Sequence, residues 1–332
     1  LFTFPPATCL SSAVIYQFIP VAAGRVMERL IRSMGPGTMA VLDLEDGHLD
    51  VRDPGKTGER RASGREQLLE LCANAKGRTN GRPVAMRVNV AGSEDFARDL
   101  PVVRAASETF GLAAVMLPKV ESADQVRRAL ADLGAEGLEF GGLVPMVETR
   151  KGMDRIDEIV AAAVEVGSPA VVYGHHDYLL DAGAWPFPGP RDVSYWEPVE
   201  RVAQPALAAG LRYVHPPEAE LRDEVLLAGM VARLRQICGH RFDVMSAGMS
   251  QTSLLLRLVE GFLSRESDIN PASGQQALTR AEKKSLAEKT RGLFEKNNRQ
   301  EHSFSADSRQ GRFISPHEYL AAKNYLREFA DA

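Results

Sequence analysis

The sequence is poor in cysteine and in long apolar runs, and each shortage excludes a class of protein. The 332-residue chain has three cysteines, Cys9, Cys72 and Cys238, which are scattered and lack the spacing of metal ligands. We expect buried or incidental thiols in a reducing compartment. No apolar run reaches the length needed to span a bilayer. The apolar residues 1–20 lack the basic segment of a signal peptide.

Basic charge is also in short supply. The chain has 40 lysines and arginines against 44 aspartates and glutamates, a formal net charge of −4. Without a basic excess we expect no nucleic-acid partner, and we expect no membrane partner either. With 44% hydrophobic residues, the composition is that of an ordinary soluble protein, expected in the cytoplasm.

Short apolar runs of strand length alternate with segments of helical periodicity along most of the chain. About eight such pairs predict a TIM (β/α)8 barrel of class α/β rather than an open doubly wound sheet. A glycine-rich phosphate fingerprint after the first strand and an internal repeat are both missing. The predicted strands are 14–20, 39–44, 84–90, 113–117, 138–147, 170–173, 211–214 and 242–246.

The pattern divides the chain into a barrel and an arm. Residues 1–264 are predicted to form the barrel, with a lead-in over 1–12 and a long polar loop over 48–63. Residues 265–332 are predicted to be a polar linker followed by a C-terminal helix with apolar residues at helical spacing. We expect that helix to pack on the barrel or on a neighbouring subunit, or to close over the site.

Two carboxylates mark the predicted site. Glu148 ends the run VPMVE, and Asp177 lies just past the run VVYGHHD. Neighbouring strands of a parallel barrel bring such residues to the C-terminal rim, where catalytic groups lie. Paired carboxylates suit Mg²⁺ or Mn²⁺, with waters and substrate oxygens completing the shell. The alternative is a pair of rim acids in salt bridges.

Further charged residues follow the second and third predicted strands. Arg87 is expected to bind a carboxylate or enolate through its planar guanidinium, or else to be a buried partner of Asp43 or Glu45. Glu45 and Asp46 are candidates for orienting metal-bound waters. Their alternative is a solvated loop.

The remaining rim residues receive mainly supporting roles. Lys119 is expected to be a partner of Glu121 or Glu148 rather than a Schiff-base lysine. His175 and His176 flank Asp177 and either shuttle protons or bond a neighbouring carboxylate. His215 is expected to be a packed rim histidine.

The motif order resembles the family of the citrate lyase β-subunit, malyl-CoA lyase and the 4-hydroxy-2-oxo acid aldolases. The motifs are FIP, LDLEDG, MRVN, LPKVES, VETRKG, GHHDYLLDAG and VHPPE. The resemblance implies a Mg²⁺-dependent carbon–carbon lyase acting through an enolate of a 2-oxo acid or acyl-CoA, in a homotrimer or hexamer. It places Glu148 and Asp177 on the metal ligands and Arg87 on the arginine that holds the oxo acid. It places Asp43, a substrate contact, in the acidic motif with Glu45 and Asp46.

Two departures from the family pattern shape the alternatives. Ser315 stands where thioester-using members carry an aspartate delivered by an adjacent subunit, and His175–His176 replaces acidic or small residues. Arg25 is a candidate contact for a coenzyme A phosphate, and His176 joins Arg87, Glu45 and Asp46 among the catalytic candidates. The alternatives are a CoA-independent 4-hydroxy-2-oxo acid aldolase, a metal-binding subunit without catalysis in a pathway complex, and, more weakly, phosphoenolpyruvate transfer.

Overall fold

The structure, a computed structural model, describes most of the chain. The described residues are 14–21, 25–75, 82–138, 140–260, 278–297, 305–307 and 312–330. The predicted lead-in, residues 1–12, lies outside this part, as does Cys9. Cys72 and Cys238 are both free and buried, as the sequence predicted.

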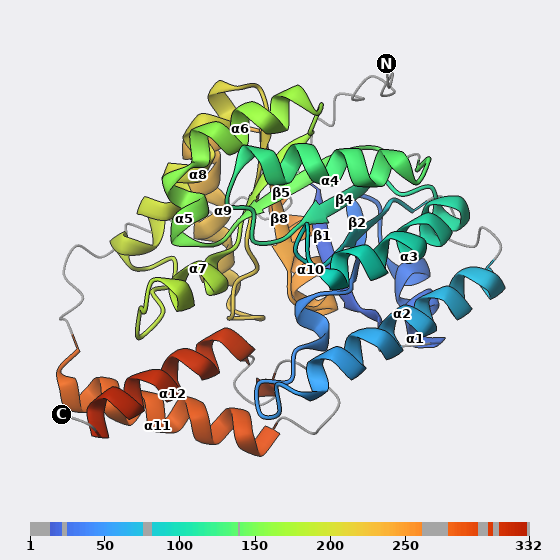
Figure 1. Cartoon of the computed structure of the whole chain (residues 1–332). Coiled ribbons are helices and arrows are strands. Elements are labelled where there is room, and N and C mark those ends of the chain that lie inside the picture. Colours follow the sequence, from blue (N-terminus) through green and yellow to red (C-terminus); the bar gives the residue numbers. More distant parts are fainter. Residues whose placement is uncertain are drawn as a thin grey trace.

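Eight parallel strands form a closed barrel in which each strand pairs with its neighbour in the sequence and β8 returns to β1. This confirms the predicted TIM barrel (Figure 1). Arrangements of this kind place polar side chains at the carboxyl ends of the strands around one mouth. The strands are β1 Ile15–Pro20, β2 Thr38–Asp43, β3 Val84–Arg87, β4 Ala114–Leu117, β5 Leu143–Val147, β6 Ala170–Tyr173, β7 Arg212–His215 and β8 Phe242–Ser246.

Helices cross between consecutive strands and cover the outside of the barrel (Figure 1). The β5–β6 crossover is divided into α5 and α6, and a short helix, α7, directly follows β6. The helices of the barrel are α1 Arg25–Ser33, α2 Lys56–Ala75, α3 Glu94–Phe110, α4 Ala123–Ala135, α5 Arg150–Asp154, α6 Ile156–Glu165, α7 His175–Asp181, α8 Val193–Ala208, α9 Glu224–Cys238 and α10 Met249–Val259.

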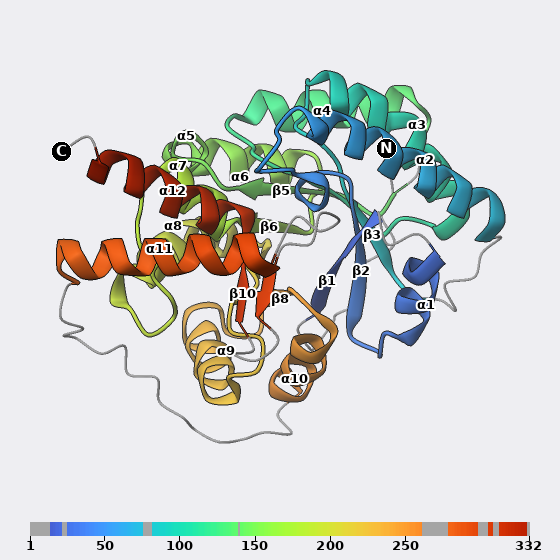
Figure 2. The same cartoon turned by 90° about the horizontal axis from the view of Figure 1, so that it is seen from below.

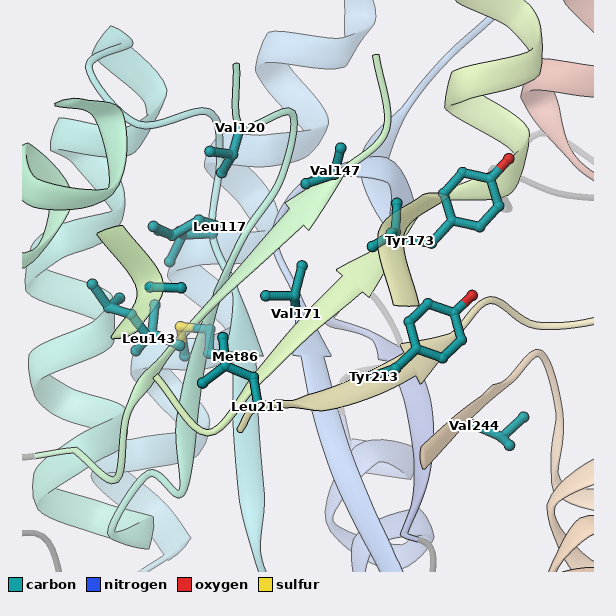
Figure 3. Packing of buried hydrophobic residues seen from close by; sticks show 14 of the residues in the cluster. Met86, Leu117, Val120, Leu143, Val147, Val171, Tyr173, Leu211, Tyr213 and Val244 are labelled. Atoms are coloured by element: carbon teal, nitrogen blue, oxygen red, sulfur yellow. The ribbon is translucent and has the colours of Figure 1, made fainter. Parts of the chain in front are cut away.

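Alternation along each strand separates two apolar cores. In β6, Ala170 and Val172 belong to the cluster inside the barrel, whereas Val171 and Tyr173 pack in the layer between strands and helices. Figure 3 shows this outer layer, with Tyr173 and Tyr213 on adjacent strands. Successive side chains of a strand point to opposite faces, so the parity of a residue decides whether it enters the barrel.

The C-terminal arm packs against the barrel of its own chain. It contains α11 Arg280–Asn297, the antiparallel strands β9 Ser305–Asp307 and β10 Arg312–Ile314, and α12 Pro316–Ala330. Figure 2 shows α11 and α12 side by side, with α7 next to α12. Trp185 belongs to an apolar cluster with residues of both arm helices and donates a hydrogen bond to the Lys283 carbonyl at 3.0 Å.

Helix α2 begins much earlier than the sequence predicted. The expected loop over 48–63 is wrong from Lys56 onward, because the polar first half of α2 is helical. Its arginines are held by carboxylates rather than by apolar contacts: Arg61 bonds Asp95 at 2.7 Å and Arg65 bonds Asp99 at 2.7 Å. Apolar periodicity alone cannot detect such a helix. Strand β5 also begins later than expected, at Leu143.

Within the described part of the chain, no helix combines the length and apolar character needed to cross a membrane.

Candidate functional site

Strand parity delivers the charged side chains to the barrel mouth. Val41, Ala85 and Met146 belong to the apolar cluster inside the barrel. Asp43, Arg87 and Glu148 each come two residues later in the sequence than one of these three. Their side chains therefore also point into the barrel, and they line one cavity. Apolar side chains fill the barrel below, and charged side chains close its top.

Arg87 is the centre of a buried charge network. Its Nε and Nη2 donate to the two carboxylate oxygens of Asp43 at 2.8 and 2.7 Å, and its Nη1 donates to Asp46 at 2.9 Å. Glu45 lies 3.2 Å from the same Nη1, and the guanidinium lies 4.9 Å from the ring centroid of Phe18. The arginine is thus paired with Asp43, as the sequence-based alternative held, while also lining the cavity.

The acidic segment after β2 is not a solvated loop. Glu45 is only 2% exposed, and the carboxylate of Asp43 accepts hydrogen bonds from the backbone N–H groups of Glu45 and Gly47 at 3.0 and 2.8 Å. Asp43 therefore fixes both the loop and Arg87. The structure excludes the solvated-loop alternative for Glu45.

Lys119 links the two halves of the acidic cluster. Its Nζ donates a hydrogen bond to Glu45 and lies 3.0 Å from Asp177 Oδ1. Its backbone N–H donates to Glu148 Oε1 at 2.8 Å. Its Nζ also lies 3.6 Å from Asp46 Oδ1. One residue therefore contacts four carboxylates, three through its ammonium and one through its backbone.

Of the two partners expected for Lys119, Glu148 is found, though bonded to the backbone N–H rather than to the ammonium, and Glu121 is wrong. Glu121 is bound by Lys151, with Nζ 2.8 Å from Oε2, and Glu148 is bound by the Lys119 backbone rather than by its ammonium. Lys119 has a positive φ of 51°, which is uncommon for a residue other than glycine. This conformation accompanies the unexpected direction of the side chain.

Glu148 and Asp177 approach the cavity from β5 and from the first turn of α7. Glu148 lies tightly against Gly174, where an added Cβ would come within 2.1 Å of Glu148 Oε2 and 2.4 Å of Glu148 Cβ. A glycine is therefore needed at position 174 for Glu148 to keep its place.

The arm adds a residue that sequence reasoning did not include. His317, in the first turn of α12, places its Nε2 3.1 Å from Asp177 Oδ1 and 3.8 Å from Asp46 Oδ1. Ser315 positions this turn, because its hydroxyl accepts the Glu318 N–H at 3.0 Å. The sequence Ser-Pro-His-Glu is a helix-start signal, with proline at the first helical position and glutamate three residues after the cap. That signal could have located the turn.

The cluster holds more acidic groups than permanent cations. Among the described residues, its carboxyl groups are Asp43, Glu45, Asp46, Glu148 and Asp177, and its permanent cations are Arg87 and Lys119.

Burial and neighbouring charges distribute protons unevenly over these acids. Burial, followed by the charge of Asp46, raises the pKa of Glu45 to about 7. Burial, followed by the charge of Asp177, raises the pKa of Glu148 to about 8. Burial also acts to raise the pKa of Asp177, but the charges of His317 and Lys119 lower it overall. A divalent cation would relieve this crowding of buried carboxylates.

The donor set fits such an ion. Asp46, Asp177 and His317 each offer one ligand atom, and these atoms lie within 4.8 Å of one another. Buried carboxylate oxygens of Glu45 (Oε2) and Asp46 (Oδ1) accept no hydrogen bond within the described part of the chain. Oxygen-rich clusters of this kind suit hard divalent cations.

Two cavities meet at the site. The inner one, about 170 Å³, is lined by Asp43, Asp46, Arg87, Glu148 and Asp177 among others. The outer one, about 480 Å³, lies among the α7–α8 loop, the segment after β7 and the arm. His175, His176 and Pro217 line both cavities, so they form the boundary between them.

His176 stands at this boundary between aromatic rings. Its ring stacks on Phe187 with centroids 5.7 Å apart and lies 5.9 Å from Phe313 of the arm. Burial, followed by the charges of His175 and His317, lowers the pKa of His176 well below its usual value. The imidazole is therefore neutral at pH 7.

His215 and His175 are neutral and lie in the wall of the site on the β6–β7 side. His215 is fully buried and bonds the hydroxyls of Tyr195 and Tyr213 at 2.8 and 3.1 Å, which confirms the predicted packed role. His175 bonds the Tyr173 hydroxyl at 3.1 Å and the Pro188 carbonyl at 3.0 Å.

Arg25, the predicted coenzyme A contact, begins α1, but its side chain lies outside the described part of the structure.

Comparison with known proteins decides the family. The model of the HpcH/HpaI aldolase/citrate lyase family matches residues 18–241. The chain belongs to this family. No curated protein sequence gives a match. The sequence-based resemblance is thereby confirmed at the level of the family.

Several solved structures share the fold of this chain. RipC from Yersinia pestis is 18% identical, with a TM-score of 0.52 over 78% of this chain and 99% of its own. The citrate lyase β-subunit from M. tuberculosis, complexed with oxaloacetate and magnesium, is 20% identical, with a TM-score of 0.55 over 75% and 97%. CitE from Mycobacterium tuberculosis, in complex with magnesium, acetoacetate and coenzyme A, is 19% identical, with a TM-score of 0.56 over 95% and 97%. At these identities the similarity establishes the fold.

Proposed function

We propose that this protein is a carbon–carbon lyase that uses a divalent cation to cleave or form the bond beside a 2-oxo acid or acyl group. The observation that carries the proposal is the crowding of five carboxyl groups at a small cavity, which four of them line, with only Arg87 and Lys119 as permanent cations of this cluster among the described residues. Such a site attracts a divalent cation and, through it, an anionic substrate.

Family membership supports the same chemistry. Aldolases and citrate lyases make or break carbon–carbon bonds, and the M. tuberculosis structures pair magnesium with oxaloacetate or acetoacetate. We extend this to the present chain and assign Mg²⁺ or Mn²⁺ to Glu148 and Asp177. When bound, the cation supplies Lewis acidity toward the oxo and carboxylate oxygens of the substrate.

Arg87 is the proposed partner of the substrate anion. A guanidinium has five N–H donors, and the described hydrogen bonds to Asp43 and Asp46 use three of them. Of the other two, the one on Nη1 lies beside Glu45, and we assign the one on Nη2 to a carboxylate in the cavity and to the negative charge that develops there. Asp43 carries no proton donor when ionised, so we assign it the positioning of Arg87 rather than a strong contact of its own with an anion.

The reaction needs a group that carries protons. In aldol cleavage of a 4-hydroxy-2-oxo acid, a base removes the 4-hydroxyl proton, the C3–C4 bond breaks, and C3 gains a proton. The products are an aldehyde or ketone and a 2-oxo acid. His176 is a candidate because it lines both cavities, and Glu45 and Asp46 can hold a water beside the substrate.

The two cavities suggest where each part of the substrate binds. The inner cavity suits a small oxo acid, and the outer cavity, about 480 Å³, can hold the remainder. The buried hydroxyl of Ser315 caps α12, so this position supplies no carboxylate for a thioester reaction. This favours the second candidate, a CoA-independent aldolase acting on a free hydroxy-oxo acid.

The proposal is tested with Glu148→Gln and Asp177→Asn, assayed with and without Mg²⁺ or Mn²⁺. Substrates are a panel of 4-hydroxy-2-oxo acids and malyl-CoA, and release of the oxo acid is measured. We expect metal-dependent cleavage by the wild type and a loss of about 10²–10³-fold in each variant, with unchanged circular dichroism. Full activity in either variant would contradict the ligand assignment.

Two further outcomes bear on the alternatives. Cleavage of malyl-CoA alone would favour the thioester enzyme and a role for Arg25. Inactivity on the whole panel, with metal still bound and a fixed partner co-purifying, would favour a metal-binding subunit without catalysis. The trimer or hexamer implied by the family resemblance is a separate proposal, measured by light scattering.

A further inference from the structure

The first turn of α12 brings an imidazole into the carboxylate cluster from the far end of the chain. His317 is 7% exposed, and its Nε2 faces Asp177 Oδ1 at 3.1 Å and Asp46 Oδ1 at 3.8 Å. The three elements involved are separate: Asp46 follows β2, Asp177 lies in α7, and His317 belongs to the arm. The contact therefore depends on the arm docking correctly.

Several contacts hold the arm where His317 can reach the cluster. The Ser315 hydroxyl caps the turn, and the Phe313 N–H donates to the Ala219 carbonyl at 2.9 Å beside the barrel. The ring of Tyr319 stacks on Phe294 of α11 with centroids 4.3 Å apart. The imidazole is thus placed by a rigid, apolar-packed helix rather than by a loose tail.

The donor atoms are close enough to share one coordination shell. An octahedral ion with ligands at about 2.1 Å separates adjacent donors by roughly 3 Å and opposite donors by roughly 4.2 Å. The separations of His317 Nε2 from Asp177 and Asp46, 3.1 and 3.8 Å, fall within that span. Asp46 Oδ1 is buried and accepts no hydrogen bond among the described residues, although the Lys119 ammonium lies 3.6 Å away, so it can accept a further ligand bond.

A simple ion pair between His317 and Asp177 would explain the shorter contact but not the rest of the arrangement. Lys119 already places its ammonium 3.0 Å from the same Asp177 oxygen. A divalent cation would take the place of the imidazole proton, so Asp177 and Asp46 would keep a cationic partner when His317 binds as a neutral ligand. Lys119 would stay bonded to Glu45.

We propose that His317 is a protein ligand of the divalent cation bound at Asp177, supplied by the arm of the same chain. The inference rests on the metal site of the proposed function and adds a nitrogen donor to it. Imidazole suits first-row transition metals, whereas Mg²⁺ prefers oxygen donors and retains its waters. The centre therefore favours Mn²⁺ or Co²⁺ over Mg²⁺.

The test uses Mn²⁺ as a spin probe in the full-length protein. Free Mn²⁺ is followed by electron paramagnetic resonance to obtain the dissociation constant, and electron spin-echo modulation reports any nitrogen bound to the ion. Wild type should show modulation from a coordinated nitrogen, and His317→Gln should lose it. We expect Mn²⁺ affinity to fall about 10–100-fold in that variant, and Mg²⁺ affinity, from competition, to fall less.

His176→Gln is the matched control, because His176 lines the same inner cavity. It should keep the nitrogen signal. Loss of the signal in His176→Gln but not in His317→Gln would overturn the proposal, as would a bound Mn²⁺ without nitrogen modulation in the wild type. If Glu148→Gln and Asp177→Asn still weaken Mn²⁺ binding in that case, the metal site of the proposed function stands while His317 is excluded as a ligand. Failure of the wild type to bind Mn²⁺ or Mg²⁺ would contradict both.

Discussion

The two sides of the barrel mouth bury polar groups in opposite ways. On the β2–β4 side, Arg87 and Lys119 are surrounded by carboxylates at 2.7–3.6 Å. On the β6–β7 side, His215 and His175 bond tyrosine hydroxyls and a backbone carbonyl. We call these the charged side and the neutral side.

The pKa values of the buried histidines differ between the charged side and the neutral side. Burial lowers the pKa of His215 to about 3 and that of His175 to about 4 on the neutral side. Burial acts on His317 in the same direction, but Asp177 and Asp46 outweigh it and raise the pKa to about 9. The charged side therefore has negative charge to share with a ligand, whereas the neutral side is a hydrogen-bonded wall.

The largest expected effect comes from removing the cation at the centre of the charged side. Arg87→Met leaves Asp43 buried without its cationic partner and removes one of the two cations beside Glu45. Breaking a buried ion pair from one side typically costs about 3–5 kcal/mol, so urea unfolding should show a loss of that size. The Mn²⁺ affinity of the folded Arg87→Met protein should change as well. Arg212→Met is the control: Arg212 binds Asp243 at 2.7 Å at the start of β7, so it should destabilise without changing metal affinity.

A steric change can disturb the charged side without altering any charge. Gly174→Ala places a Cβ 2.1 Å from Glu148 Oε2, although the backbone at φ −100° and ψ 92° accepts alanine. Glu148 must move, and we expect metal affinity to fall about 10–100-fold, measured by Mn²⁺ titration. Gly189→Ala meets no atom within 4 Å and should bind Mn²⁺ as the wild type does. Equal Mn²⁺ affinities in the two variants would show that Glu148 is not a ligand of the metal.

The sequence predicted the fold because strand-length apolar runs alternate with helical segments, and it predicted the strand-end positions of the charged residues because side chains alternate along a strand. Runs such as 170–173 are apolar throughout, as buried parallel strands are, and the strand ends at Asp43, Arg87 and Glu148 follow from parity. The first half of α2 was missed because ion pairs, not apolar residues, hold it to the barrel.

Long-range contacts set the limit of sequence reasoning. His317 lies 140 residues after Asp177, and only docking of the arm brings them together. The helix-start signal at Ser315 marks the turn locally, but it does not say where the turn docks. The Lys119 ammonium likewise bonds Glu45, 74 residues away, rather than the nearby Glu121.

The neutral side should lose stability in acid. The folded-state pKa of His215 lies below its value of about 6.5 in the unfolded chain, so the unfolded state binds more protons between pH 6.5 and 3. Stability therefore falls as pH drops through this range, by about 1.4 kcal/mol per unit for this group, or about 2 kcal/mol from pH 6.5 to 5. The groups facing it are the Tyr195 and Tyr213 hydroxyls and His175.

This acid sensitivity is measured as unfolding free energy against pH. His215→Gln should flatten the slope relative to the wild type, because glutamine does not titrate. The exposed His240 is the control, and His240→Gln should keep the wild-type slope. An unchanged slope in His215→Gln would mean that the imidazole is not buried in its neutral form.

The smallest expected effect connects the arm to the charged side. Ser315→Ala removes the hydroxyl that accepts the Glu318 N–H at 3.0 Å, and loss of such a cap costs about 1 kcal/mol. Ser122→Ala removes an equivalent cap from α4, where the side chain accepts the Gln125 N–H. Both variants should lose similar stability in urea, but only Ser315→Ala should weaken Mn²⁺ binding, because only its turn carries His317. Equal Mn²⁺ affinities would show that the charged side forms without help from the arm, since a frayed first turn of α12 could then leave the centre intact.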